Sequence, residues 1–155
     1  MDLDGDIVWK PEGTDYGINA AGYVIHSAIH LARRDVNAVI HTHSTAGMSV
    51  SAMTSGLLPL TQTLVLRSHG LLACGPGIPE AFNTLYQLET SCRAQVAALV
   101  AGLDAVAPPP QDVIDLTAKV FDPKSIRPYG RLEWPAMLRK VEAETTNNGY
   151  PYYAS

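Results

Sequence analysis

The stretch VNAVIHTH, residues 36–43, decides the fold of this chain. Its first five residues are a compact, mostly apolar run, which is bounded by Asp35 on one side and by polar residues on the other. Because β-branched residues favour extended backbone, we predict a strand over Val36–Ile40. The two histidines of the stretch then lie at the carboxyl end of that strand.

The spacing of His41 and His43 is a chelating arrangement. Side chains two residues apart on a strand return to the same face, so both imidazoles can reach one point. A third ligand from a neighbouring loop would complete the open three-ligand pattern of a catalytic metal site. His69 is the candidate, since the following Gly70 allows a close approach. Surface or hydrogen-bonded histidines also fit this spacing, which leaves both interpretations open.

A second pair of histidines, His26 and His30, is spaced at i, i+4 on a predicted helix, and this spacing can also bind metal. Their neighbours Tyr23, Ile25 and Ile29 are typical of a packing helix. We therefore expect His26 and His30 to find polar partners in a core or supporting role.

Helical and extended segments alternate around the central strand, which favours an α/β fold. Asn19 and Ser44 are predicted to cap two of the helices. The predicted helices are 20–34, 44–54, 79–103, 112–120 and 135–144, and the other predicted strands are 6–9, 64–66 and 71–74.

The composition excludes several classes of protein. With 46% hydrophobic and 17% charged residues, the 155-residue chain is typical of one globular domain. A formal charge of −4 without a basic run argues against nucleic acid binding. Cys74 and Cys92 are the only cysteines and suggest a reducing compartment. An acidic start without a signal sequence, and apolar stretches too short to span a bilayer, predict a cytoplasmic protein without a membrane span.

Two long blocks of sequence resemble the signature blocks of class II aldolase/adducin proteins. They are INAAGYVIHSAIHLARRDVNAVIHTHSTAGMSVSA and LRSHGLLACGPGIPEAFNTLYQLETSCRAQVAAL, and MDLDG and LEWPAMLRK add to the similarity. The resemblance implies a three-layer α/β/α sandwich with a central, largely antiparallel sheet, usually assembled as a tetramer. It also implies a divalent metal, most often zinc with manganese as another option, held by His41, His43 and His69. Ser68 stands where asparagine is common in the family.

The resemblance implies a reaction as well. In the aldolase and epimerase members, the metal holds neighbouring carbonyl and hydroxyl oxygens of the substrate and stabilises the enediolate. Three departures bear on this activity. The acid/base glutamate of the aldolases falls on Gly22, and the small hydroxyl residues that often hold substrate phosphate are matched by Ala20 and Ala21. The third departure is a segment of several tens of residues that is missing between Thr63 and Leu64.

We accordingly divide the chain into three parts. Residues 1–106 form the class II aldolase/adducin-like domain, internally shortened near 63–64 and lacking some strands of the sheet. Residues 107–144 form a proline-rich spacer with C-terminal helices, and residues 145–155 form a flexible tail.

Two functions from different classes follow. The first is a metal-dependent aldehyde-lyase or isomerase acting on a small hydroxy-carbonyl compound, with no base yet assigned. The second is a non-catalytic, adducin-like oligomerisation or interaction module, with weak support for cytoskeletal binding, or an inactive truncated member. Both predict a homo-oligomer.

Overall fold

The computed structural model describes residues 2–10, 12–13, 17–58, 64–107, 109–120, 122 and 129–146. The elements in chain order are α1 (Ala20–Ala32), β1 (Ala38–Thr42), α2 (Thr45–Ala52), β2 (Leu64–Leu66), β3 (Gly70–Gly75), α3 (Ile78–Leu99), a 3-10 turn (Leu103–Ala105), α4 (Gln111–Val120) and α5 (Trp134–Thr146).

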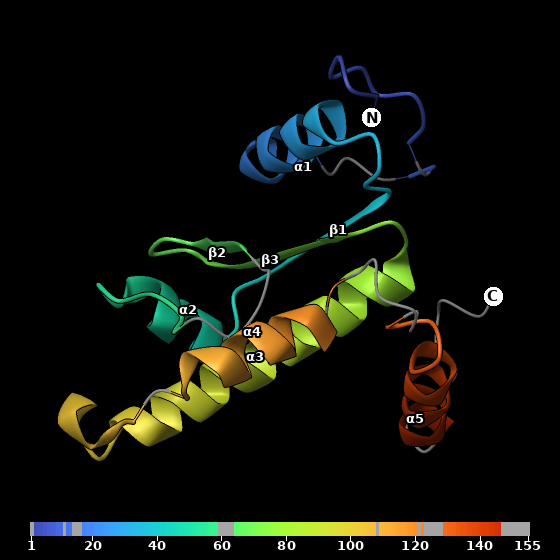
Figure 1. The fold of residues 1–155 in the computed structure, drawn as a ribbon. Helices are drawn as coiled ribbons and strands as arrows, with labels where there is room; N and C mark the ends of the chain where they lie inside the picture. The colour runs from blue at the N-terminus through green and yellow to red at the C-terminus, as the bar shows by residue number, and fades with distance from the viewer. Residues whose placement is uncertain are drawn as a thin grey trace.

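The three strands form a sheet in the order β1-β3-β2, and both pairings are antiparallel. In the β1–β3 register, Ala38 lies opposite Gly75 and His41 lies opposite Leu72. Figure 1 shows α1 on one side of this sheet and α2 and α3 on the other. The predicted α/β/α arrangement with an antiparallel central sheet is confirmed.

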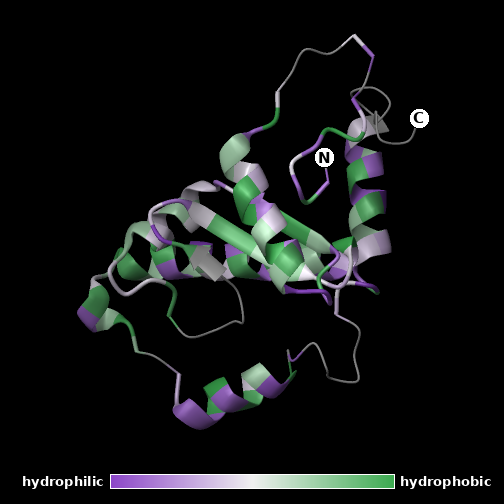
Figure 2. Ribbon diagram, turned by 90° about the horizontal axis from the view of Figure 1, so that it is seen from above, coloured by the Kyte–Doolittle hydropathy of each residue, from purple (hydrophilic) through white to green (hydrophobic). Residues whose placement is uncertain are grey.

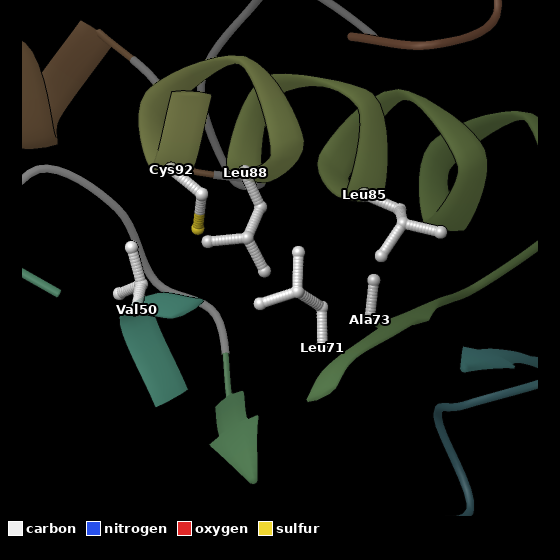
Figure 3. Packing of buried hydrophobic residues seen from close by; sticks show 6 residues of the cluster. All are labelled: Val50, Leu71, Ala73, Leu85, Leu88 and Cys92. Carbon is white, nitrogen blue, oxygen red and sulfur yellow. The ribbon is translucent and has the colours of Figure 1, made fainter. Parts of the chain in front are cut away.

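The core lies between β3, α2 and α3. In Figure 3, Leu71 and Ala73 point from β3 toward three residues of α3. Those three residues of α3 are Leu85, Leu88 and Cys92, and Val50 of α2 closes the cluster. Because strand side chains alternate, the other face of β3 is turned toward α1. Burial raises the pKa of the Cys92 thiol to about 11, so this cysteine stays protonated and packs as a small apolar side chain.

The predicted helix caps are confirmed. The Asn19 side chain accepts a hydrogen bond from the backbone N–H of Gly22 at 3.2 Å, and Ser44 Oγ accepts one from Gly47 at 3.1 Å. Each cap satisfies an N–H group that the first turn of a helix leaves without an internal partner. Since Ser44 directly follows His43, the cap also fixes where the chain turns after the histidine pair.

The predicted end of one helix and one whole predicted strand are wrong. The helix predicted to reach residue 103 ends at Leu99, because Val100 and Gly102 donate to carbonyls three residues back and Gly102 takes a φ of 92°. The strand predicted over 6–9 is irregular in the structure. A strand needs a partner, and none of the described strands pairs with this segment.

Smaller differences occur at other ends. The strand β1 begins at Ala38 and includes His41 and Thr42, whereas α5 extends through Thr145 and Thr146. The rest of the predicted tail, 147–155, lies outside the described residues, as do residues 59–63 on the amino-terminal side of the 63–64 junction. None of the described helices is long and apolar enough to cross a membrane.

A considerable amount of apolar surface remains exposed. Trp9 is 75% exposed in the irregular amino-terminal segment, and Val24 of α1 is 62% exposed. In Figure 2 the strands are mostly hydrophobic in colour, whereas α5 alternates between hydrophobic and hydrophilic residues. Large apolar side chains exposed in this number are a feature of surfaces that further chain or a partner covers.

We predict that the isolated chain associates with itself or binds an apolar dye more strongly than its longer relatives. The reason is the exposed apolar surface together with the edges of a three-stranded sheet, which present unpaired backbone groups. Light scattering with dye fluorescence measures both effects. A monodisperse monomer that leaves the dye dark would show that the remaining elements close the core by themselves.

Candidate metal centre

The three histidines of the predicted site come from two neighbouring parts of the sheet. His41 is part of β1, His43 follows the end of that strand, and His69 lies in the turn between β2 and β3. Since β1 pairs with β3, the end of β1 lies beside the start of β3, and His69 directly precedes that start. His41 is opposite Leu72, so it lies on the face of the sheet away from the core.

The imidazole rings converge through their Nε2 atoms. The distance from His41 Nε2 to His43 Nε2 is 2.7 Å, and that from His43 Nε2 to His69 Nε2 is 3.2 Å. One ligand nitrogen from each residue can be chosen so that all lie within 4.8 Å of one another. Two nitrogens bound to one tetrahedral metal at about 2.0–2.1 Å are separated by roughly 3.3 Å. The distance of 3.2 Å matches that of a shared metal, and the distance of 2.7 Å is shorter, so a metal would move His41 and His43 slightly apart.

The other nitrogen of His41 is fixed by the backbone. His41 Nδ1 lies 2.7 Å from the carbonyl oxygen of Leu71. A carbonyl can only accept, so Nδ1 carries the proton and Nε2 presents its lone pair to the centre of the cluster. A hydrogen bond of this kind orients the ring and makes the ligand more basic.

A tight turn presents His69 to the cluster. The backbone N–H of His69 donates to the carbonyl of Leu66 at 3.0 Å, and that of Ser68 donates to Ser51 of α2 at 2.9 Å. Ser68 takes a positive φ of 56°, a conformation in which glycine or asparagine is less strained. This requirement gives a physical reason for the asparagine that the resemblance places at position 68.

Gly70 leaves no room for a side chain beside the cluster. A Cβ at this position would overlap the carbonyl oxygen of Thr42 and would lie 3.1 Å from Cδ2 of His43 and 3.4 Å from Cε1 of His41. The absence of a side chain at Gly70 therefore lets the turn and the end of β1 approach each other.

We expect Gly70→Ala to lower the free energy of unfolding by about 1–3 kcal/mol, because the backbone of β1 must shift to admit the methyl group. Urea denaturation measures this change. Gly17→Ala is the matched control, because a Cβ at Gly17 meets nothing within 4 Å. Equal stability of Gly70→Ala and the wild type would mean that the turn has more room than the structure shows.

The histidines of α1 do not join the cluster. His30 Nδ1 lies 3.1 Å from the carbonyl oxygen of Val36, to which it donates, as expected for a histidine with a polar partner. Burial lowers the pKa of His26, and the charges of His30 and His41 lower it further. The described residues contain one group of three or more potential metal ligands, and it consists of His41, His43 and His69.

Gly22 lies one helical turn before His26, and α1 lies on the side of the sheet that carries His41 (Figure 1). The nearest atoms to a Cβ at Gly22 belong to Asn19, at 3.8 Å or more. The helix therefore has space for a larger residue at this position.

The cluster is open to solvent on one side. His41 is partly buried, whereas His43 and His69 are exposed. Ser44, next to His43, donates a hydrogen bond to Glu89 of α3 and so ties this end of the site to the core helix. The Leu71 and Ser51 carbonyls and the Glu89 contact were not predicted, because nothing in their residue types distinguishes them from other positions.

Comparison with known proteins shows the family and the fold of the chain. The sequence profile of the class II aldolase and adducin N-terminal domain matches residues 1–65 and 61–96, which is more than half of the chain. The chain belongs to this family. The two matched stretches meet at 61–65, the place where the sequence predicts an internal shortening.

The individual relatives include bacterial proteins and mammalian adducins. A protein of Pseudomonas aeruginosa assigned to aldolase class 2 is 35% identical, over 87% of this chain and 66% of its own length. Rat alpha-adducin is 29% identical over 98% of this chain, which spans only 27% of that protein. The adducin alignment runs over 202 positions, several tens more than the whole present chain of 155 residues.

Solved structures give the same result. The aldolase II superfamily protein from Pseudomonas syringae superposes with a TM-score of 0.83 and 35% identity, covering 94% of this chain and 71% of that one. L-fuculose 1-phosphate aldolase from Glaciozyma antarctica superposes with a TM-score of 0.78 at 24% identity, covering 94% and 68%. The second likeness shows the fold alone.

Proposed function

We propose that this chain binds one divalent metal through His41, His43 and His69, and acts as a metal-dependent lyase or isomerase on a small hydroxy-carbonyl compound. The convergence of three Nε2 atoms on one point carries the proposal. The residues present fit a metal, because His41 is already oriented by its bond to Leu71 and Gly70 leaves the cluster uncrowded. Zinc is the first choice, since three neutral imidazoles with an open position are typical of its catalytic sites.

A bound metal would supply Lewis-acid polarisation and a template for two neighbouring substrate oxygens. The protein's own contribution is to hold the three imidazoles, to expose one side of the cluster, and to place α1 over the same face of the sheet. Ala20 and Ala21 offer no hydroxyl groups for a phosphate. The proposed substrate is therefore an unphosphorylated hydroxy-carbonyl compound.

Elemental analysis after dialysis tests the metal part of the proposal. The chain is loaded separately with zinc and manganese, dialysed against metal-free buffer and analysed for metal per chain. We expect about one equivalent of the preferred ion. A chain that retains no metal under either condition would contradict the proposal, and the same samples are then assayed for cleavage of a panel of small hydroxy-carbonyl compounds.

A second function, a non-catalytic interaction module, is favoured by Gly22. The position that carries the acid/base glutamate in the aldolases has no side chain here, and α1 leaves Val24 and Leu31 exposed. In this alternative the histidines remain from metal-binding relatives and have no catalytic role, and another copy of the chain covers the apolar surface. Self-association that does not change on metal removal, without cleavage of any compound in the panel, would favour it.

We further propose that the chain works as a homo-oligomer in the cytoplasm and that its sheet is shortened near 63–64. The two matched stretches that meet at 61–65 support the shortening, and the exposed apolar residues of α1 support the assembly. Sedimentation analysis of the purified chain tests the assembly directly.

A further inference from the structure

His43 differs from the other two histidines of the cluster in how it is held. His41 lies within β1, and its Nδ1 bonds to the carbonyl of Leu71. His69 is held in its turn by the hydrogen bond from its N–H to the carbonyl of Leu66. His43 lies between the end of β1 and the start of α2, and its Nδ1 has no hydrogen-bond partner among the described residues. Its place in the cluster therefore depends on the backbone that connects β1 to α2.

Ser44 sets the course of this backbone. Its Oγ accepts a hydrogen bond from the N–H of Gly47 at 3.1 Å, and its carbonyl oxygen accepts one from the N–H of Met48 at 2.8 Å. Both groups thus hold the first turn of α2. The hydroxyl hydrogen of Ser44 is donated to the carboxylate of Glu89 on α3. Because a serine hydroxyl has a single hydrogen, this donation leaves its lone pairs available to Gly47.

Glu89 is anchored in the part of α3 that forms the core. Its neighbour Leu88 is fully buried, and so is Cys92, one helical turn further along. Burial raises the pKa of the Cys92 thiol, and the nearby charge of Glu89 raises it further. Among the described residues, Ser44 makes the one hydrogen bond to the Glu89 carboxylate, which has no salt bridge there. The carboxylate therefore has one specific contact, and that contact leads to the residue after His43.

We propose that Glu89 is a positioning residue for the metal ligand His43 and acts through the hydroxyl of Ser44. This inference rests on the proposed metal site. The carboxylate holds the hydroxyl, the hydroxyl fixes the point at which α2 begins, and the backbone between that point and β1 sets the direction of the His43 ring. Loss of a group that orients a ligand directly costs about 10–100-fold in metal affinity. Since Glu89 acts through another residue, its effect lies at the lower end of that range.

The first test is the zinc affinity of the whole chain, measured by competition with a chelator. Glu89→Leu removes the acceptor at similar size, and we expect it to bind zinc about tenfold more weakly. Glu89→Gln keeps an acceptor without the charge and should bind nearly as tightly as the wild type. The control is Asp104→Asn, which removes the same charge from an exposed position in the 3-10 turn.

Two outcomes of this test count against the proposal. If urea denaturation shows a less stable Glu89→Leu chain that still binds zinc like the wild type, the role of Glu89 is structural alone. If Glu89→Gln binds zinc as weakly as Glu89→Leu, the charge is responsible and the hydrogen bond to Ser44 is not.

Ser44→Ala tests whether Glu89 acts through the hydroxyl. Without that hydroxyl the carboxylate has nothing to hold, so Glu89→Leu should cause no further loss of zinc affinity in the Ser44→Ala chain. Residues that act through one contact give such non-additive effects in a double-mutant cycle. Losses that add up in the double variant would overturn the proposal.

A measurement without metal separates this inference from the proposed function. In the metal-free chain, the ring C–H signals of His43 are followed by proton–carbon NMR and assigned by their loss in His43→Ala. We expect these signals to shift or broaden in Glu89→Leu and in Ser44→Ala, and to stay unchanged in Asp104→Asn. A wild type that binds no zinc would contradict the proposed function, whereas unchanged His43 signals in Glu89→Leu would contradict the role of Glu89.

Discussion

Replacing His43 with alanine is expected to remove the bound metal while leaving the fold almost unchanged. His43 lies beyond the end of β1, is exposed, and has its Nε2 within 3.2 Å of the Nε2 atoms of both other histidines. Loss of a hydrogen bond that only supports a ligand costs metal proteins about 10–100-fold in affinity, and we expect loss of the ligand itself to cost more.

The measurement is zinc affinity by competition with a chelator, together with urea denaturation of the metal-free chain. His69→Ala should behave like His43→Ala, whereas His41→Ala also loses the hydrogen bond to Leu71 and should be less stable. His26→Gln is the matched control, since His26 lies outside the cluster. Wild-type zinc affinity in His43→Ala or His69→Ala would show that the metal is held elsewhere.

Gly22→Glu is expected to produce zinc-dependent cleavage of hydroxy-carbonyl compounds, or to increase it strongly. The position lies on α1, on the side of the sheet that carries His41, and outside the helix backbone the atoms nearest to a Cβ there belong to Asn19, at 3.8 Å or more. A positioned general base contributes typically about 10²–10⁴-fold to the rate. The substitution should also stabilise the first turn of α1 by about 1 kcal/mol, because glycine is a poor helix former.

Three further chains make the result interpretable. Gly22→Gln has nearly the same shape without a carboxylate, and Gly22→Glu with His43→Ala has the base without the full set of ligands. Neither variant should show the increase in zinc-dependent cleavage that is expected for Gly22→Glu. Cleavage by the wild type at the rate of Gly22→Glu would mean that another group already supplies the base. No gain despite full metal occupancy would favour the interaction module.

One competing contact is built into the helix. Gly22 is the third residue of α1, and its N–H already bonds to the Asn19 side chain. A glutamate at this position can reach back to the backbone N–H of the capping residue instead of toward the metal. Combining Gly22→Glu with Asn19→Asp, which keeps the cap and repels the new carboxylate, directs the base away from this contact.

Local signals in the sequence predicted much of the fold. The apolar stripe of α3, the caps at Asn19 and Ser44, and the turn before Gly70 all follow from short patterns that tertiary contacts did not override. The strand predicted over 6–9 was wrong because Ile7, Val8 and Trp9 have the composition of a strand but pair with none of the described strands. Strand formation depends on distant residues, whereas a helix satisfies its own backbone.

The candidate site was predicted in a similar, partial way. The two-residue spacing of His41 and His43 indicates a shared face, but spacing alone could not bring His69 to the same point. The β1–β3 register does so, and it depends on long-range pairing. Two other features of the site depend on backbone atoms and cannot be predicted from residue types. They are the hydrogen bond from His41 to the carbonyl of Leu71 and the overlap with Thr42 that a side chain at Gly70 would cause.

The most direct test of the metal centre is X-ray absorption at the zinc edge of the zinc-loaded chain. We expect three imidazole nitrogens at about 2.0–2.1 Å with a further light ligand, and no sulfur. His43→Ala, loaded in the same way, should lose imidazole scattering. A sulfur shell near 2.3 Å, or fewer than three imidazoles in the wild type, would contradict a centre built from His41, His43 and His69.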